Sequence, residues 1–330
     1  MSTFSHSDEA AASDGRRPIG CVANESIDQI DDALARGEYV WLNLTAATDG
    51  EIQRAGEALG LHPLTVEDMQ EFDQRAKVED YHDYVYIVAY GATLDDADHD
   101  SLIEVHIIYS PGFLATVAAE VSAELGRLHD QAEDRALSGH ELLHSVLDAL
   151  VDSYAPVLDR LDGEIEQLEE LIVARDLRGR ELEIHNLRRR LTRIDRTVHR
   201  QLESFTSIRE VLRRMPDHRA DDFPYFRDLL DHLIHVAESA DAMRERIAGL
   251  FELYMAAPEN RQNILMKQLT GIAGIFLPLS VVTGFFGMNF AWMVEEINSK
   301  PAFLLLGLGL PLAILGLLVV VIAHRGFFRE

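Results

Sequence analysis

The sequence predicts a mostly helical α+β protein that joins a soluble α/β domain to two C-terminal transmembrane helices. Two charge-free runs indicate the membrane part, Gln268–Val294 with 27 residues and Ala302–Ala323 with 22, because about 20 apolar residues span a bilayer core. Short runs of β-branched and aromatic residues before residue 138 indicate strands among helices. From Glu141 onward, apolar residues recur every three or four positions, which is typical of long amphipathic helices.

The first 137 residues divide into a leader and the α/β domain. Residues 1–37 are predicted to be a polar, partly disordered leader, since the first 20 lack the apolar core of a signal peptide. Residues 38–137 are predicted to form a cytosolic α/β domain. Its expected strands cover residues 39–44, 84–89, 103–108 and 113–117, with turns at 91–100 and 110–112 and helices at 51–60 and 118–132.

Residues 138–215 are predicted to form a long antiparallel helical hairpin. Its first arm extends to Arg175 with a kink or boundary at Pro156, a turn follows at 176–179, and the second arm extends to about Met215. The first arm is acidic near its tip and the second is basic, which favours antiparallel pairing, although each exposed pair contributes little. A stalk helix, residues 216–262, opens at Pro224, is interrupted at Pro258 and leads into the first transmembrane helix.

The predicted membrane part consists of a first span at residues 263–290, an outer loop at 291–300, a second span at 301–324 and a tail at 325–330. Basic residues flank the cytoplasmic ends of such spans, and here Lys267 directly precedes the first charge-free run while Arg325 and Arg329 follow the second. We therefore expect a multi-pass protein of the cell (inner) membrane with both termini in the cytoplasm. The single cysteine, Cys21, excludes an intrachain disulfide and fits a reducing compartment.

The formal net charge of −26 is concentrated in the soluble part. Residues 261–330 carry a net charge of +2, so the first 260 residues carry −28. Such a field repels nucleic acid and attracts divalent cations. The chain's only lysines, Lys77, Lys267 and Lys300, do not follow glycine, so no phosphate-binding loop for ATP is present. We expect cations and the lipid bilayer as partners, no nucleic acid and no enzymatic activity.

One amide near the outer end of the first span indicates ion handling. Asn289 is unfavourable in hydrocarbon unless it faces water or another chain. Gly284 stands five residues before it, and further steps of three and four residues trace a small or mildly polar face with some apolar members: Gly284, Ser280, Leu277, Ala273, Thr270, Leu269, Met266 and Asn263. Small residues on such a face also allow close helix packing. The second span has no polar stripe, so a channel needs several copies of this chain around an axis.

Gly287-Met288-Asn289 resembles the Gly-Met-Asn signature of the CorA magnesium-transporter family. Further segments are similar to that family in the same order, and together they cover about residues 38–325. These segments are His62–Leu64, Val66–Asp68, Gln74–Glu79, Leu147–Asp152, Pro224–Asp228, Asp231–His232, Asn263–Thr270 and Phe276–Ser280.

The resemblance implies a homopentameric funnel that takes up Mg²⁺, with Co²⁺ and Ni²⁺ as further cargo candidates. The implied selectivity filter is Gly287, Met288 and Asn289, where amide oxygens hold the hydrated ion through its waters. The implied pore and gate residues are Asn263, Met266, Leu269, Thr270, Ala273, Leu277, Ser280 and Gly284. A regulatory Mg²⁺ site between cytosolic domains is implied at Glu67, Asp68, Asp148 and Asp228, and ion binding there favours the closed pore.

Some departures from the family pattern bear on gating. Ala291 replaces a usual acidic residue and Val294 a usual proline, which weakens the expected concentration of cations at the outer mouth. The basic cluster usual at the C-terminus is reduced to Arg325 and Arg329. Pro258 is expected to bend the stalk.

Three alternative functions stay open at this point. A ZntB-like zinc transporter shares the scaffold, although Met288 favours Mg²⁺ because the zinc proteins commonly have Val there. A membrane-tethered divalent-ion sensor would use the spans as anchors, but an outer loop of ten residues leaves no outer domain. His140-Glu141-Leu142-Leu143-His144 matches a zinc-protease pattern but has no third ligand within a helical turn. The physiological ion stays open among Mg²⁺, Co²⁺, Ni²⁺ and Zn²⁺, and an inside-negative potential favours uptake.

Overall fold

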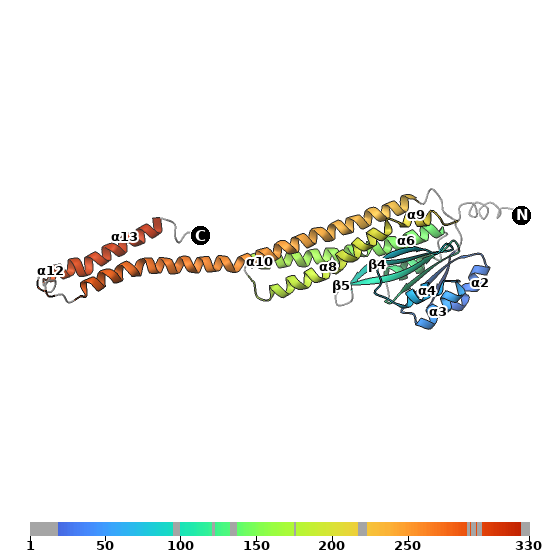
Figure 1. The fold of residues 1–330 in the computed structure, drawn as a ribbon, viewed down its shortest axis with the longest axis horizontal. Helices are drawn as coiled ribbons and strands as arrows, with labels where there is room; N and C mark the ends of the chain where they lie inside the picture. The colour runs from blue at the N-terminus through green and yellow to red at the C-terminus, as the bar shows by residue number, and fades with distance from the viewer. Residues whose placement is uncertain are drawn as a thin grey trace. The chain divides into compact units, whose positions relative to one another are not determined.

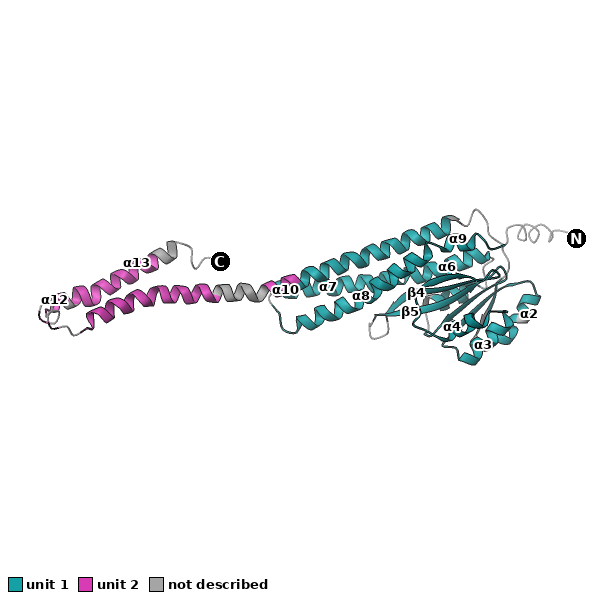
Figure 2. Ribbon diagram, viewed as in Figure 1, with its two compact units in different colours: residues 1–251 teal, residues 252–330 magenta. Residues whose placement is uncertain are grey.

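In the computed structural model, the described residues are 19–94, 100–120, 123–132, 137–174, 176–216, 223–288, 291, 295 and 299–324. They belong to two compact units, residues 1–251 and 252–330, which Figure 2 colours separately. The first unit holds a mixed sheet and several long helices, and the second holds two long apolar helices. The predicted fold class, an α/β domain followed by long helices and two C-terminal spans, is confirmed.

A six-stranded mixed sheet forms the centre of the α/β domain (Figure 1). Its order is β1-β2-β6-β5-β4-β3, with β2 parallel to both β1 and β6 and the remaining pairs antiparallel. The strands are β1 (Ile19–Ala23), β2 (Tyr39–Thr45), β3 (Lys77–Asp80), β4 (Val85–Leu94), β5 (Asp100–Tyr109) and β6 (Phe113–Ala118). The central strands are buried on both faces, so they consist of nearly continuous apolar residues.

Short helices cover one face of the sheet: η1 (Asn24–Gln29), α2 (Ile30–Ala35), α3 (Asp49–Ala58) and α4 (Pro63–Gln70). Sequence explains where two of them begin. Thr48 and Glu51 form a capping box at the start of α3. Pro63 occupies the first turn of α4, where its missing N–H is tolerated. Fully buried Ile30, Ile52 and Met69 from these helices pack against apolar side chains of β2, β4 and β6.

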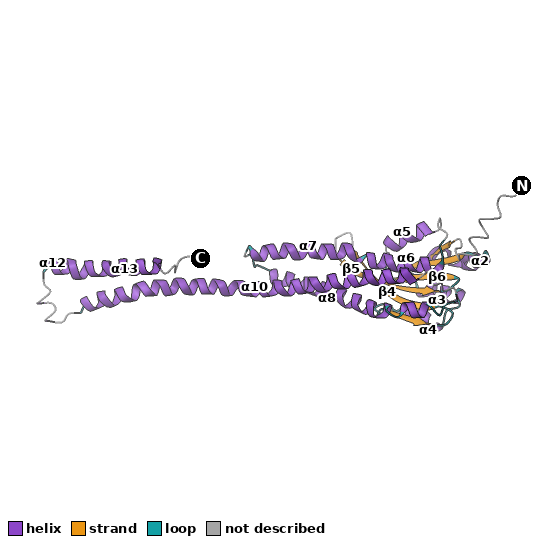
Figure 3. Cartoon of the chain, turned by 90° about the horizontal axis from the view of Figure 1, so that it is seen from above, coloured by secondary structure: helices purple, strands orange, loops and turns teal. Residues whose placement is uncertain are grey.

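Longer helices cover the opposite face, as Figure 3 shows from above. They are α5 (Ala123–Ala132), α6 (Gly139–Asp152), α7 (Tyr154–Val173), α8 (Arg180–Phe205) and the short α9 (Ile208–Leu212). The chain approaches the sheet closely where α6 gives way to α7. Ser153 Oγ accepts a hydrogen bond from the N–H of Ala92 at 2.8 Å, and a Cβ on Gly91 would lie 2.7 Å from that oxygen. Glycine is therefore required at position 91 for this packing.

The helices α7 and α8 form the antiparallel hairpin, and Gly179 takes the left-handed conformation (φ +77°) in its turn. Their buried side chains follow the predicted three-to-four spacing. The 64-residue helix α10 (Phe223–Phe286) lies beside the hairpin along its first part. Ion pairs from Arg246 to Asp162 and from Arg244 to Asp195 join α10 to α7 and α8.

The second unit contains the end of α10, then α12 (Lys300–Ala302), the π-helical segment η3 (Phe303–Gly309) and α13 (Leu310–His324). Two candidate membrane spans are long and apolar enough to cross a bilayer, Leu265–Phe286 and Lys300–Val320. In an 18-residue apolar stretch of each span, only 6% and 0% of the residues are buried against the rest of the chain. A core helix of a soluble protein would be covered, so this exposure favours a membrane environment.

Several predicted boundaries in the α/β domain were wrong. Residues 19–35 of the predicted leader form β1, η1 and α2, because Ile19, Ile27 and Ile30 are buried in the domain. The strands extend further into the expected turn at 91–100 than predicted, since β4 continues to Leu94 and β5 begins at Asp100, and residues 95–99 lie outside the described residues. Ala118 belongs to β6 rather than to the following helix, which begins at Ala123. Helix α4 and strand β3 were not predicted.

Boundaries among the long helices also differ from the prediction. The first arm divides at Ser153 instead of Pro156, and the second arm ends at Phe205 before the separate α9. Pro258 was expected to interrupt the stalk, but α10 continues through it, because a proline removes one hydrogen bond and does not by itself end a long helix. Helix α10 ends at Phe286, so Gly287 and Met288 of the Gly-Met-Asn signature follow the helix, and Asn289 lies outside the described residues.

Candidate ion path and cytosolic metal sites

Most of the first span is uncovered in the single chain, including the face that carries the predicted pore residues. The predicted pore and gate side chains that the structure describes are all exposed: Met266, Leu269, Thr270, Ala273, Leu277, Ser280 and Gly284. The positions with reduced exposure, among them Gly271, Ile275 and Val282, lie on the other side of the helix. The structure therefore places the predicted residues together on one free face, while the side chain of Asn263 lies outside the described residues.

The start of the signature continues the helix end with hydrogen bonds. The N–H of Gly287 donates to Thr283 O at 2.9 Å, and the N–H of Met288 donates to Phe285 O at 3.2 Å. Gly287 lies in a turn, and Met288 is exposed. Asn289, the predicted filter residue, lies outside the described residues. The N–H groups of Gly287 and Met288 thus satisfy two carbonyl oxygens of the last helical turn, and the signature begins as a continuation of that turn.

Two of the predicted regulatory carboxylates meet at one histidine. Asp148 lies on α6 and Asp228 on α10, and His232 stands one turn after Asp228. His232 Nδ1 lies 3.4 Å from Asp148 Oδ1, and His232 Nε2 lies 3.9 Å from Asp228 Oδ2. Asp152 completes this group, because ligand atoms of Asp148, Asp152 and His232 all lie within 4.8 Å of one another.

This group, called here the α6–α10 cluster (Asp148, Asp152, Asp228 and His232), is electrostatically strained. Burial and the neighbouring charge of Asp148 raise the pKa of Asp152, and His232 and His144 oppose that rise. Asp148 Oδ1 is buried and accepts no hydrogen bond from the described residues. A divalent cation would relieve the repulsion between these carboxylates. Asp152 and His232 were not predicted as ligands, although each stands four residues after a predicted ligand and thus on the same helical face.

The other predicted pair, Glu67 and Asp68, lies on α4. Glu67 is exposed, whereas Asp68 is half-buried and already has a cation partner: Lys77 Nζ is 2.5 Å from Asp68 Oδ2. Lys77 also lies 4.9 Å above the ring of Tyr86. Because α4 and α6 cover opposite faces of the sheet (Figure 1), one chain does not bring the two predicted pairs together.

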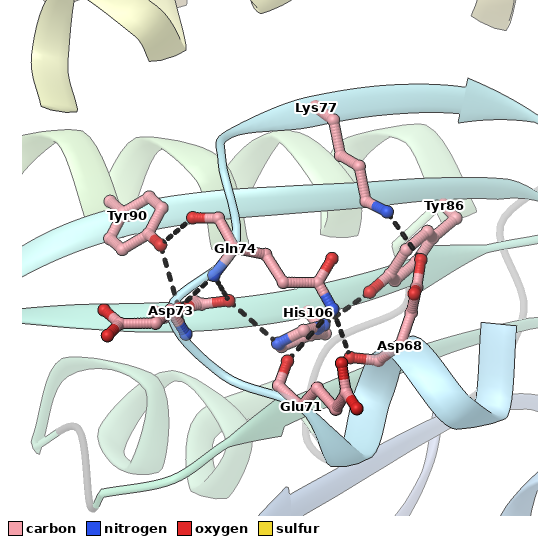
Figure 4. A network of polar contacts seen from close by, with 9 residues as sticks. Asp68, Glu71, Asp73, Gln74, Lys77, Tyr86, Tyr90 and His106 are labelled. Carbon is pink, nitrogen blue, oxygen red and sulfur yellow. Dashed lines mark hydrogen bonds and ion pairs between the residues drawn. The ribbon is translucent and has the colours of Figure 1, made fainter.

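A buried polar network holds the loop between α4 and β3 (Figure 4). Glu104 accepts hydrogen bonds from the N–H of Asp73 at 2.6 Å and of Gln74 at 3.1 Å, and from the hydroxyl of Tyr90 at 2.8 Å. Gln74 Nε2 in turn donates to the carbonyl of Asp68 at 2.7 Å. The loop that connects Asp68 to Lys77 is thus fixed from the middle of the sheet.

The charge of Glu104 is stabilised despite its burial. Burial by itself raises the pKa of a carboxyl, but the adjacent His106 and the hydrogen bonds from Tyr90 and the Asp73 amide leave the pKa of Glu104 below its usual value. His106 Nε2 lies 3.2 Å from Glu104, and His106 Nδ1 is 2.5 Å from the Tyr86 hydroxyl. Burial is also the main cause of the raised pKa of Tyr86, so its hydroxyl keeps its proton.

Comparison with known proteins shows the family to which the chain belongs. The family model described as "CorA-like Mg2+ transporter protein" matches residues 36–325. The chain belongs to the CorA-like Mg²⁺ transporter family. It is 34% identical over 263 residues to the "Cobalt/magnesium transport protein CorA" of Thermotoga maritima, covering 77% of this chain and 74% of the relative. It is 27% identical over 315 residues to the "Putative metal ion transporter YfjQ" of Bacillus subtilis, covering 92% and 93%.

Solved structures support the CorA-like fold. The complete structure of the CorA magnesium transporter from Methanocaldococcus jannaschii matches with a TM-score of 0.72 at 21% identity, over 87% of this chain and 90% of that one. The ZntB cytoplasmic domain from Vibrio parahaemolyticus matches with a TM-score of 0.56 at 13% identity, over 68% and 88%. At these identities both likenesses concern the fold alone.

The zinc-protease pattern serves a structural purpose in this CorA-like chain. Glu141 forms a capping box with Ser138 at the start of α6. His140 is buried and lies 3.0 Å from the Tyr109 hydroxyl through Nδ1. His144 packs beside the ring of Tyr225, with ring centres 5.3 Å apart. Each member therefore has a packing or capping contact within the fold.

Proposed function

We propose that this chain is one subunit of a divalent-cation channel that takes up Mg²⁺ along the membrane potential, with Co²⁺ and Ni²⁺ as further cargo. Membership of the CorA-like Mg²⁺ transporter family supports the transport class. The observation that carries the proposal is the uncovered face of the first span, from Met266 to Gly284, which leads to Gly287-Met288-Asn289. Nothing in this reaction is catalytic, since no covalent bond changes.

The proposed assembly is a homopentamer in the cell (inner) membrane with both termini in the cytoplasm. One span with one free face does not enclose a water-filled path, so copies must place this face around a common axis. Met266, Leu269 and Leu277 would then form apolar rings that gate by excluding water, and Asn263 a polar ring near the cytosolic end. The hydroxyl group of Thr270 has no free hydrogen-bond donor toward that path, because it donates to Met266 O at 2.7 Å.

The proposed filter is the ring of Asn289 side chains with Gly287 and Met288. Mg²⁺ loses its waters reluctantly, and neutral amide oxygens bind the hydrated ion without holding it too tightly to leave. Such an outer-sphere filter also admits Co²⁺ and Ni²⁺. The driving force needs no ATP, because a dication that crosses 100 mV gains about 4.6 kcal/mol, twice the roughly 2.3 kcal/mol of a single charge.

The proposed gate responds to cytosolic Mg²⁺ bound between subunits. In one chain, Asp148 and Asp228 lie on one side of the sheet, and Glu67 and Asp68 on the other. A site that uses both pairs therefore needs two neighbouring subunits. Bound Mg²⁺ would offset repulsion within the α6–α10 cluster and join adjacent subunits, which favours the closed state, and its loss would loosen the ring.

Ion flux tests the proposal directly. The purified full chain is reconstituted into liposomes loaded with a Mg²⁺-sensitive dye, under an inside-negative potential, with parallel runs for Co²⁺, Ni²⁺ and Zn²⁺. We expect Mg²⁺ entry that rises with the potential. Zinc entry driven by a proton gradient without Mg²⁺ entry would instead favour a ZntB-like transporter, and no flux of any ion would favour a membrane-tethered sensor.

A further inference from the structure

A second group of metal-binding side chains joins α8 to α10, apart from the α6–α10 cluster. Asp195 and His199 stand one turn apart on α8, and Asp241 faces them from α10. Ligand atoms of all three lie within 4.8 Å of one another. We call this group the α8–α10 cluster. None of its members belongs to the carboxylates that the family resemblance implies.

Asp195 is the buried member, with only 5% of its surface exposed. Its Oδ2 accepts a hydrogen bond from Arg244 Nη1 at 3.1 Å. Its Oδ1 is buried and accepts no hydrogen bond from the described residues, although His199 Nδ1 lies 3.3 Å away. His199 Nδ1 is hydrogen-bonded to the Asp195 carbonyl oxygen instead, so the buried Oδ1 lacks a hydrogen bond of its own. Such a buried oxygen is costly and rare, and it requires an explanation.

The ring of His199 has the hydrogen bond that is typical of metal-binding histidines. Its Nδ1 lies 2.9 Å from the carbonyl oxygen of Asp195, one turn earlier, which assigns the ring proton to Nδ1. Metal-bound histidines commonly donate their second ring N–H in this way. The lone pair of Nε2 then faces Asp241, whose Oδ2 is 3.4 Å away. Two ligands of a tetrahedral ion with bonds of about 2.0–2.1 Å stand about 3.3 Å apart.

Arg244 forms ion pairs with both carboxylates of the cluster. Its two terminal nitrogens reach Asp195 Oδ2 at 3.1 Å and Asp241 Oδ1 at 3.0 Å. One oxygen of each carboxylate is therefore paired with the guanidinium, and the other faces His199. The arginine offsets part of the repulsion in the empty cluster and competes electrostatically with an incoming cation.

We propose that Asp195, His199 and Asp241 bind a divalent transition-metal ion, of the Co²⁺, Ni²⁺ or Zn²⁺ class, that ties α8 to α10. The imidazole ligand selects this class, because Mg²⁺ prefers oxygen ligands and octahedral geometry. Three protein ligands leave the fourth position of a tetrahedral ion to water. The site does not depend on the proposed transport function, since all three residues lie in the first unit, outside the candidate membrane spans.

The test is Co²⁺ binding to the full chain in detergent, after removal of metals with a chelator. All proteins carry His232→Ala, so that the α6–α10 cluster offers no imidazole. Visible absorption reports tetrahedral Co²⁺, and dialysis gives the number of ions bound. We expect one tetrahedral Co²⁺ per chain, lost on His199→Ala and weakened at least tenfold on Asp241→Asn. His185→Ala, which removes an exposed histidine of the same helix, should bind as the parent does.

Any one of three results would contradict the proposed metal site: no tetrahedral Co²⁺ band in the parent protein, a band that survives His199→Ala, or displacement of Co²⁺ by Mg²⁺ at equal concentration. Arg244→Gln gives a further distinction that does not rely on loss of binding. A metal site predicts tighter Co²⁺ binding once this competing cation is gone. A cluster of ion pairs alone predicts no Co²⁺ binding and only a lower melting temperature.

Discussion

At the scale of single residues, the carboxylates of the proposed regulatory site differ in how free they are. Asp228 is exposed and turned toward His232, whereas Asp68 is held by Lys77. Both were predicted as ligands from their positions in family motifs, but the ion pair was not evident, because Lys77 lies nine residues away across a loop. Asp152 and His232 were missed as members of the same group although their four-residue spacing was visible.

Removal of Lys77 should make closure more sensitive to internal Mg²⁺. The substitution Lys77→Gln frees Asp68 from a partly buried ion pair of about 1 kcal/mol, which corresponds to about a fivefold lower half-inhibiting concentration. Flux from proteoliposomes that contain graded internal Mg²⁺ measures this concentration. An unchanged or raised value in Lys77→Gln would show that Asp68 does not bind the regulatory ion.

Asp228→Asn should act in the opposite direction. Loss of a direct ligand should raise the half-inhibiting Mg²⁺ concentration at least about tenfold, since even partners of ligands have effects of that size. The matched control is Asp231→Asn, which removes an exposed carboxylate one turn away on the same helix. Equal behaviour of the two variants in the same flux assay would reject a specific role for Asp228.

Glu104 should make stability depend on pH. The pKa of Glu104 is lowered in the folded state. Its contribution to the free energy of unfolding is therefore present above the usual carboxyl pKa of 4.5 and is lost as the pH falls through the folded-state pKa. At pH 7, Glu104→Gln should lower stability by roughly 1.5–3 kcal/mol, because charge-assisted hydrogen bonds to the loop are lost. Thermal unfolding of the full chain in detergent between pH 7 and pH 4 measures both effects. A variant with the same pH dependence as the parent would exclude this role.

At the scale of elements, sequence patterns predicted long elements better than short ones. The hairpin, the stalk and both spans have many apolar residues at helical spacing, so their positions were evident. Strands β1 and β3 have five and four residues, and their identity depends on pairing with β2 and β4 from elsewhere in the chain. Local sequence carries little information about such pairing.

The contact between β4 and the α6–α7 junction should be intolerant of a methyl group. Gly91→Ala places a Cβ 2.7 Å from Ser153 Oγ and 3.2 Å from the Leu150 carbonyl oxygen, so we expect a loss of about 1–3 kcal/mol. Gly163→Ala in α7 is the control, because nothing lies within 4 Å of its Cβ position. It should be neutral or gain about 0.5–1 kcal/mol. Melting temperatures in detergent should therefore move apart, and equal shifts would contradict the close approach.

At the scale of the whole molecule, the two spans of one chain do not enclose an ion path. The face with Thr270, Ala273 and Ser280 is only mildly polar, so contact with lipid costs little free energy. One such face, however, does not form a path for a hydrated ion. The sequence identified this face, while its closure requires residues of other copies. Native mass spectrometry of the detergent-purified chain should give five copies. A stable monomer or dimer that still conducts Mg²⁺ would contradict the pentameric funnel.

The most direct test of the central claim is Mg²⁺ influx through Asn289→Ala. The comparison uses proteoliposomes under an inside-negative potential, with Asn298→Ala as a control that removes another amide from the same outer segment. If the Asn289 ring is the filter, its removal abolishes potential-driven influx while the oligomer stays intact, and Asn298→Ala conducts as the parent does. Undiminished influx through an intact Asn289→Ala oligomer would show that the ion does not pass the ring we assign.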